Sequence, residues 1–406
     1  MKVSTIKGFH LNTFFRGLLP IFALAHFSHH LLLTLLIPLM PLIRDEFALD
    51  YTKAGLLFSV LTLSYGISQL PAGWLADHIG ARILITVGIC GVALAGLLVG
   101  LSQTYTMMLG FLVLMGVLGG GYHPASTPLI SMSVDSKNRG RALGVHLIGG
   151  SSSFFLAPLI AAAIAATLGW RAPFIILAAP IMIFGITFYV LLGRLTKKGV
   201  IKHKSTSPSD HPVIQKHSRH LVPFIILATF TIAVLNSTIS FIPLFLVDNF
   251  GLAMETAAAS VSIIYFAGLL ASPLGGYLSD RFGRVPVLLV AAFTAGPVIC
   301  MLNIVPSGFV IGVILFMLGV ILYTPQPASE AYIIGQASDH RRSSTLGIYF
   351  GGSLTGTGII TPLIGYSIDQ VGFFTSFTIA GATILVVSLI CSIWLWVRIK
   401  TASHTY

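Results

Sequence analysis

The sequence predicts an all-α membrane protein in which twelve transmembrane helices form two six-helix bundles related by a parallel repeat. The 406 residues are 55% hydrophobic and only 9% charged, with a mean hydropathy of +0.92. Such a composition is incompatible with a surface that faces water on all sides. Twelve apolar runs are long enough to cross the ~30 Å hydrocarbon layer as helices. The second half of the chain also repeats the first at an offset of 203 residues.

The apolar runs are helices rather than barrel strands, because barrel strands alternate polar and apolar residues. Lipid offers no partners for backbone hydrogen bonds, so helices are the remaining spanning structure. The first run is too long for a signal peptide and has no evident cleavage site, so it is a retained span. The expected spans are residues 17–43, 54–74, 83–101, 106–132, 142–166, 171–193, 221–247, 256–278, 286–304, 308–334, 344–368 and 373–397.

The repeat is clearest in two short polar segments that separate long apolar runs. Residues 73–82 lie between the second and third spans, and residues 276–284 lie between the eighth and ninth. We expect both segments to form turns. A stretch rich in Lys, His, Ser and Pro separates the halves, as a solvated linker does. The expected organisation is therefore a bundle at 1–194, a cytoplasmic linker at 195–220 and a second bundle at 221–406.

The basic residues predict the orientation in the membrane. Apart from Arg44, Lys53 and Arg171, the Lys and Arg residues fall at the termini, in the linker and in the connections on the same side. By the positive-inside rule, both termini of a multi-pass protein of the cytoplasmic (inner) membrane face the cytoplasm. This asymmetry accounts for the net charge of +11, so no nucleic-acid partner is indicated. On the outer side, residues 44–46 are expected to form a solvated cap, and residues 169–171 an interfacial anchor.

The first span carries His26, His29 and His30, which share one helical face. Polar groups at this depth usually face a bundle interior or a water-filled cavity. Three interpretations remain open, namely neutral histidines bonded to neighbouring helices, a proton or substrate role, and a metal site. No carboxylate lies in the same span, which weakens the third, and the three cysteines show no zinc-site spacing. The sequence alone therefore predicts no metal site and no cofactor.

The fourth and tenth spans contain corresponding segments that interrupt a helix. Residues 119–126 include three glycines and Pro124, and residues 323–330 include Pro325 and Pro327. Broken helices at matching positions in two halves mark binding sites in transporters. His123 is expected to have a functional role here. Glu330 is an acidic residue within a span. It has either a role in proton coupling or substrate binding, or it forms an ion pair with the arginine at 341 or 342.

The polar segments follow the pattern Gly-x-Leu-x-Asp-x-x-Gly and resemble the signature of the major facilitator superfamily. The resemblance covers the whole chain and implies a central cavity that opens alternately to either side. It also implies that Asp77 helps to hold a cytoplasmic gate shut, with Arg139 or Arg141 as partner, and that Asp280 pairs with Arg342. The alternative is a turn that only sets topology. The gate-motif candidates are Gly73, Asp77, Gly80, Arg82, Arg139, Arg141, Gly276, Asp280, Gly283, Arg284 and Arg342.

A narrower set of segments resembles the fosmidomycin-resistance type of efflux protein. These are residues 28–29, 44–47, 122–124, 149–150 and 157–158, mainly in the first half. This resemblance implies export of small compounds against inward proton flow. The chain departs from the group because its first span lacks an acidic residue. The glycines expected of an antiporter's fifth helix are also reduced to Ala157-Pro158.

The sequence thus predicts a secondary active transporter that moves a small organic compound by alternating access, with proton-coupled efflux (antiport) favoured. The alternatives are proton-coupled uptake of a metabolite or organic acid, a non-transporting receptor of the same fold, and a metal exporter. An enzyme is disfavoured, because one carboxylate in the spans is too few for paired-acid chemistry. Expected partners are the substrate, protons and the lipid bilayer, with the chain a monomer.

Two groups of residues are predicted to serve the transport cycle. The proton-coupling candidates are His26, His29, His123 and Glu330. The substrate-cavity candidates are His30, Tyr65, Gln69, Tyr122, His146, Asn236, Tyr265, Tyr323, Gln326 and Tyr349.

Overall fold

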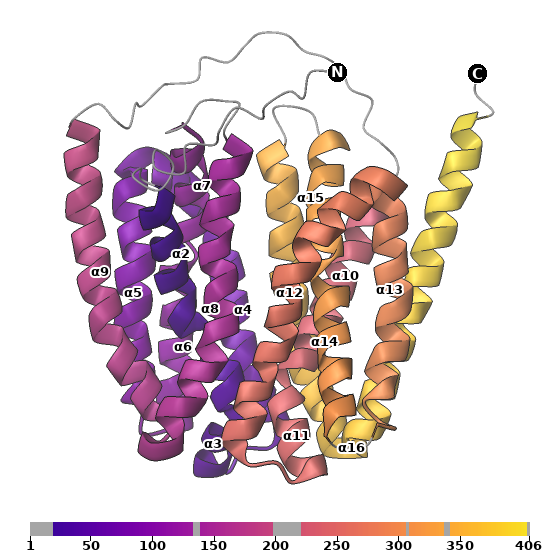
Figure 1. Cartoon of the computed structure of the whole chain (residues 1–406), viewed down its shortest axis with the longest axis horizontal. Coiled ribbons are helices and arrows are strands. Elements are labelled where there is room, and N and C mark those ends of the chain that lie inside the picture. The colour runs from indigo at the N-terminus through magenta and orange to yellow at the C-terminus, as the bar shows by residue number, and fades with distance from the viewer. Residues whose placement is uncertain (1–18, 133–138, 198–220, 306–307, 337–341, 404–406) are drawn as a thin grey trace, which may run out of the picture.

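The computed structural model describes residues 19–132, 139–197, 221–305, 308–336 and 342–403, and every regular element in these ranges is an α-helix. Helices α2 to α9 lie on one side of the molecule and α10 to α16 on the other (Figure 1). The predicted linker at 195–220 lies outside the described residues from position 198 onward. The helices of the first half are α2 (Leu19–Leu33), α3 (Leu36–Phe47), α4 (Tyr51–Ile79), α5 (Ala81–Gly100), α6 (Tyr105–Gly119), α7 (Tyr122–Met132), α8 (Arg139–Leu168) and α9 (Arg171–Lys197). Those of the second half are α10 (Leu221–Ser240), α11 (Ile242–Phe250), α12 (Met254–Phe282), α13 (Arg284–Met301), α14 (Phe309–Tyr323), α15 (Pro325–Gln336) and α16 (Arg342–Ser403).

The predicted all-helical fold with twelve spans is confirmed. Eleven helical segments of the described chain are long and apolar enough to cross a membrane, and one of them, Ile348–Leu395, has 48 residues. This segment is two spans, because Gly372 interrupts α16 with a φ of 74° and a ψ of 173°. We call the end of the molecule with the connections α3–α4 and α11–α12 the distal face. The opposite end, where α2 and α10 begin, is the proximal face (Figure 1).

Four spans are broken in mid-course, at corresponding places in the two halves. Each break separates a long helix from a shorter one, as in α2–α3, α6–α7, α10–α11 and α14–α15. A proline removes the hydrogen bond to the residue four positions earlier and its ring crowds that carbonyl. Such pairs sit at every break, namely Pro38 with Thr34, Pro124 with Gly120, Pro243 with Ile239, and Pro327 with Tyr323. The sequence analysis predicted the second and fourth breaks and missed the other two.

The polar segments at 73–82 and 276–284 are not turns along their whole length, which corrects the prediction. Helix α4 continues to Ile79 and α12 to Phe282, because neither segment contains a proline to stop it. Only Gly80 and Gly283 leave the helical path, with φ of 91° and 93°. These positive angles favour glycine, since a side chain would clash with the backbone. The reversal between spans therefore takes one residue in each half.

Helices α2 and α8 approach each other closely, because two glycines of α8 face α2. A Cβ on Gly149 would lie 1.9 Å from the carbonyl oxygen of Ala23, and one on Gly150 would lie 2.5 Å from Cε1 of His26. Real Cβ atoms do not make such contacts. The close packing places the histidines of α2 directly against α8.

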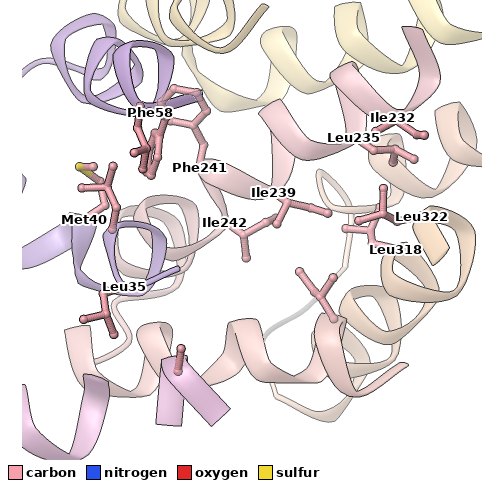
Figure 2. Close-up of a cluster of buried hydrophobic side chains, with 14 of the residues drawn as sticks. Leu35, Met40, Phe58, Ile232, Leu235, Ile239, Phe241, Ile242, Leu318 and Leu322 are labelled. Carbon is pink, nitrogen blue, oxygen red and sulfur yellow. The ribbon is translucent and has the colours of Figure 1, made fainter. Parts of the chain in front are cut away.

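The two halves also share a hydrophobic core. Buried side chains of α3 and α4, including Met40 and Phe58, belong to the same cluster as Phe241 and Ile242 from the second half (Figure 2). Polar contacts cross the same boundary, where the Ser59 hydroxyl donates to the carbonyl of Gly358 on α16. We call this boundary between the two halves the seam.

Candidate functional site

A charged contact joins the two halves at the distal face. Arg44, near the end of α3, donates through both terminal nitrogens to the Asp248 carboxylate of α11, with one N–O distance of 2.8 Å. The Tyr51 hydroxyl of α4 donates to the same carboxylate. The side chains of Arg44 and Asp248 are only 16% and 25% exposed. The prediction of a solvated cap is therefore wrong for Arg44, because a counter-charge of the other half partly covers it.

A second carboxylate holds the first turn of α4 from across the seam. Asp369 of α16 accepts hydrogen bonds from the backbone nitrogens of Tyr51 and Thr52, each at 2.8 Å, and from the Thr52 hydroxyl. The first amides of a helix have no partners within the helix, and the helix dipole favours a negative charge there. Asp369 thus satisfies these amides and fastens the halves together at the distal face.

The predicted interfacial anchor at residues 169–171 has a different partner. Arg171 pairs with Glu46 of α3 at 2.5 Å, and the Trp170 indole donates to the same carboxylate at 2.7 Å. Both contacts stay within the first half. They hold α9 against α3, which supports the position from which Arg44 reaches Asp248.

The histidines predicted from the sequence gather into one cluster inside the first half. His26, His29 and His30 come from α2, His123 from the first turn of α7, and His146 from α8. The rings of His26 and His146 stack with centroids 4.2 Å apart, and the ring of His123 lies 5.0 Å from His26 and 5.2 Å from His30. Three of the four predicted proton-coupling residues therefore lie together. The break between α6 and α7 allows His123 to face α2.

Backbone carbonyls fix the tautomers of three of these rings. Nδ1 of His26 donates to the carbonyl of His146 at 2.8 Å, Nδ1 of His146 to that of Phe22 at 3.1 Å, and Nδ1 of His29 to that of Gly88 at 3.0 Å. A carbonyl oxygen only accepts, so the hydrogen sits on Nδ1 and a neutral ring keeps a lone pair on Nε2. This follows from the acceptor chemistry and not from an observed hydrogen.

The Nε2 atoms of these three rings differ in their surroundings. The Tyr65 hydroxyl donates to Nε2 of His29 at 3.1 Å. Nε2 of His26 and of His146 are buried and have no hydrogen-bond partner among the described residues. An unpaired buried acceptor costs about 1–3 kcal/mol. A structural role alone explains His29 well and leaves this cost at His26 and His146 unexplained.

The cluster reaches the seam through His30. Nε2 of His30 lies 3.1 Å from Nε2 of His123, and both side chains are partly buried rather than enclosed. The ring of His30 packs against Phe154 of α8 at 5.0 Å, and Phe154 packs against Tyr265 of α12 at 5.4 Å. Tyr265 belongs to the other half, so the histidines lie within two aromatic contacts of it.

The predicted substrate-cavity residues divide into two sets. His30, Tyr65, Tyr122 and His146 belong to the histidine cluster, where the Tyr122 ring stacks on His29 at 4.3 Å. Tyr265 and Tyr323, with ring centroids 6.5 Å apart, lie in the second half. The remaining candidates make no hydrogen bond or ring contact with the histidines within the described part of the chain, and these are Gln69, Asn236, Gln326 and Tyr349.

Glu330, the fourth predicted coupling residue, lies apart from the histidines on α15. Its side chain is partly buried, and it interacts electrostatically with Tyr349, a fully buried residue of α16. No cation of the described residues lies within 4.0 Å of its carboxylate. The arginines at 341 and 342 that were considered as partners fall outside the described side chains. The tenth span therefore carries a partly buried carboxylate close to its break, on α15.

The gate motif is described only in part. The side chains of Gly73, Asp77, Arg139, Arg141 and Arg342 lie outside the described set, so the predicted latches stay predictions. Arg82 donates through Nε to the carbonyl of Tyr189 at 2.8 Å, and its guanidinium lies 3.6 Å from the centre of that ring. Arg284 donates to the carbonyl of Ala331 at 2.7 Å. Arg82 and Arg284 thus each hold two helices of the same half together.

A hollow of about 410 Å³ lies beside the second copy of the motif. Its lining includes Ser279, Asp280, Gly283, Arg284 and Tyr332. Asp280 is exposed and Arg284 partly buried. The hollow therefore surrounds the turn at Gly283 on the proximal side of the second half.

Sequence comparison gives one family and a set of named relatives. A family model described as the Major Facilitator Superfamily matches residues 22–324 and 224–405. A protein named multidrug resistance protein MdtG from Enterobacter lignolyticus (strain SCF1) is 27% identical over 368 residues, 87% of this chain and 86% of that protein. The protein of the same name from Proteus mirabilis (strain HI4320) is 28% identical over 314 residues, 74% and 76% of the two chains. These relatives carry a multidrug name, so the narrower likeness to fosmidomycin-resistance proteins stays a prediction.

Structural comparison agrees on the fold. A bacterial homolog of the human lysosomal transporter Spinster, in an inward-facing and occupied conformation, superposes with a TM-score of 0.78 at 17% identity, covering 95% of this chain and 96% of that one. A POT family transporter in complex with 5-aminolevulinic acid gives a TM-score of 0.79 at 14% identity, covering 94% and 96%. At such low identity these matches bear on the arrangement of helices alone.

Proposed function

The chain belongs to the Major Facilitator Superfamily and is a secondary transporter of small molecules, and we propose that it exports a small organic compound across the cytoplasmic membrane in exchange for protons. We place the proximal face in the cytoplasm, as the distribution of Lys and Arg predicts. In this orientation the distal face is the outer face.

The observation that carries the alternating-access part of the proposal is the pair of carboxylate contacts at the distal face. Asp248 and Asp369, both of the second half, hold Arg44 and the first turn of α4 in the first half. Contacts of this kind release when the halves rock apart and form again when they close. The structure therefore represents a state closed on the distal side, which in the proposed orientation would take up substrate from the cytoplasm.

Export is supported by the relatives, which carry multidrug-resistance names over most of the chain's length. The substrate is proposed to be neutral or amphiphilic, because the spans hold few charges. A carboxylate or phosphate substrate usually requires an arginine clamp, and the sequence places no arginine deep in a span. Uptake of an organic acid by symport, the second candidate, is less well supported for the same reason.

Glu330 is the proposed coupling group. A partly buried carboxylate without an ion pair exchanges a proton more readily than a salt-bridged one, and no cation of the described side chains pairs with Glu330. It also lies on the span whose break corresponds to the one at His123. Whether His26, His29 and His123 also exchange protons stays a prediction.

The test is a transport assay in proteoliposomes with an imposed pH difference. Ethidium, a lipophilic cation, and chloramphenicol, a neutral compound, serve as probes after cells expressing the chain have been screened for reduced sensitivity to both. We expect the pH difference to drive probe movement in the wild-type protein. Glu330→Gln should abolish this movement and retain exchange of probe for probe, because exchange needs no net proton transfer.

Glu255→Gln is the matched control, since Glu255 is a carboxylate of the same half in the first turn of α12. It should transport like the wild type. Probe flux that ignores the pH difference, together with an unimpaired Glu330→Gln variant, would show that protons are not coupled. A driven flux that moves probe from the distal to the proximal side would instead support uptake.

A further inference from the structure

We propose that His26, His30 and His123 form a binding site for a divalent transition-metal ion of the Zn²⁺ class. One ring nitrogen of each residue lies within 4.8 Å of those of the other two. The residues come from α2 and α7, so the site depends on the fold and not on a local sequence motif. It goes beyond the proposed transport function, because binding of the ion requires no transport.

The spacing of the nitrogens is close to what a tetrahedral ion needs. With Zn–N bonds of 2.0–2.1 Å, two ligand nitrogens stand about 3.3 Å apart. Nε2 of His30 and Nε2 of His123 are already 3.1 Å apart. All separations within the group are at most 4.8 Å, so none exceeds the tetrahedral value by more than ~1.5 Å.

The hydrogen-bond pattern of His26 is that of a metal ligand. Metal-binding histidines usually donate their second ring N–H to a carbonyl or carboxylate, which fixes the tautomer and orients the ring. His26 makes this bond to the carbonyl of His146 at 2.8 Å. Its Nε2 then carries no hydrogen and offers its lone pair to a metal ion. This atom is buried and has no hydrogen-bond partner in the described chain. The side chain is 3% exposed, so no bulk water competes for this atom.

The neighbouring histidines support the site without joining it. Nε2 of His29 accepts a hydrogen bond from Tyr65 and is therefore occupied. His146 stacks on His26 and supplies the carbonyl that orients it. Three neutral imidazoles suit Zn²⁺, Co²⁺ and Ni²⁺, whereas Mg²⁺ and Ca²⁺ prefer oxygen ligands. Three protein ligands also leave a fourth position open for water or a solute.

Two of the three ligands are not fully enclosed. His30 and His123 are partly exposed, and His30 packs against Phe154, which contacts Tyr265 of the other half. The group contains no carboxylate among the described residues, so a bound ion keeps its positive charge there.

The experiment measures Zn²⁺ bound to the full-length protein in detergent, purified through a tag without histidine. Histidines 203, 211, 217 and 220 of the linker are replaced by Gln in all samples, because they would bind metal independently. After equilibrium dialysis, elemental analysis should find about one Zn²⁺ per chain. His30→Gln and His123→Gln should each weaken binding at least about tenfold, because loss of even a partner that only orients a ligand costs about 10–100-fold.

His78→Gln is the matched control, since His78 is an exposed histidine of the same half that bonds its own helix at the Trp74 carbonyl. It should bind Zn²⁺ as the background protein does. Thermal unfolding of each variant shows whether lost binding reflects lost folding. X-ray absorption at the zinc edge of the unmutated site avoids that question, and three imidazole nitrogens at about 2.0 Å are expected.

Three results would each overturn the proposal. The first is a background protein that binds no more Zn²⁺ than a variant lacking all three histidines. The second is a zinc spectrum with oxygen ligands only, and the third is binding that survives both single substitutions unchanged. Each of them leaves the proposed transport function standing, because that function is tested by probe flux.

Discussion

Replacing Asp248 by Asn should open the distal face. The carboxylate accepts two bonds from Arg44 and one from Tyr51, and the paired side chains are 16% and 25% exposed. Exposed pairs contribute about 0.2–1 kcal/mol, and breaking a fully buried pair costs about 3–5 kcal/mol. This partly buried pair should lie between them, at about 1–2 kcal/mol. If the closed state alone has the contact, its population relative to the open state should fall by a factor of about 5–30.

Distances between spin labels in lipid nanodiscs measure this shift. The labels are attached at Gln103→Cys and Thr256→Cys, exposed positions near the distal face in the two halves. The native cysteines at 90, 300 and 391 are first replaced by Ser. The Asp248→Asn variant should gain a population at longer distance. Loss of the Arg44 contact should produce the same gain in an Arg44→Gln variant.

Asp45→Asn is the control, because Asp45 also contacts Arg44, at 3.3 Å, but belongs to the same half and is 49% exposed. Its removal leaves the contact across the seam in place, so the distances should not change. Identical distance distributions in the wild type and Asp248→Asn would refute the reasoning. If Asp45→Asn opened the distal face equally, the opening would depend on the local charge and not on the contact of Arg44 with Asp248.

Two further predictions concern packing within one half. Gly149→Ala should lower the free energy of unfolding in detergent by about 1–3 kcal/mol, because its Cβ would lie 1.9 Å from the Ala23 carbonyl oxygen. Gly110→Ala is the control and should leave the stability unchanged, because the space around its Cβ is open. Arg82→Lys should cost about 1 kcal/mol in the same assay, since lysine keeps the charge and loses both the Nε bond and the stacking on Tyr189. Arg281→Lys should cost less, because the contacts of this exposed arginine with Tyr277 and Phe282 are themselves exposed and its guanidinium lies 5.5 Å from the ring centre; equal effects of the two substitutions would contradict the stacking account.

The sequence predicted the spans and the repeat because both depend on local composition. Long apolar runs define spans in any context, and prolines weaken helices locally, although α4 continues through Pro71 and α8 through Pro158. The breaks near Pro38 and Pro243 are not evident from the sequence, because these prolines have neither the glycine run of residues 119–121 nor the Pro-x-Pro pair of residues 325–327. Helices α4 and α12 extend past the predicted spans, to Ile79 and Phe282, because polar residues continue a helix that projects into water.

The contacts across the seam could not be predicted in the same way. Arg44 and Asp248 are 204 positions apart, and their pairing depends on how the two halves are docked. Asp369 was not singled out because an exposed acid has no distinctive sequence pattern. One signal was available, since both Arg44 and Asp248 fall in corresponding outer connections and carry opposite charges. For the histidines, the spacing in the sequence predicts a shared face on the first span. It does not predict that α7 and α8 pack against that face, because this depends on the tertiary fold.

The duplicated backbone carries different chemistry in its two halves, and this difference bears on mechanism. The offset of 203 residues pairs His26 with Thr229, His123 with Gln326 and His146 with Tyr349. The second half thus repeats the broken helices but carries a hydroxyl or amide at these three positions, and Ile232 and Ala233 where the first half has His29 and His30, while Glu330 supplies its carboxylate. A soft cation is then favoured on one side of the seam, and a proton on the other. Since the ligands of the proposed ion all belong to one half, the ion could stay bound while the halves rock, whereas the contact of Arg44 with Asp248 must break in every cycle.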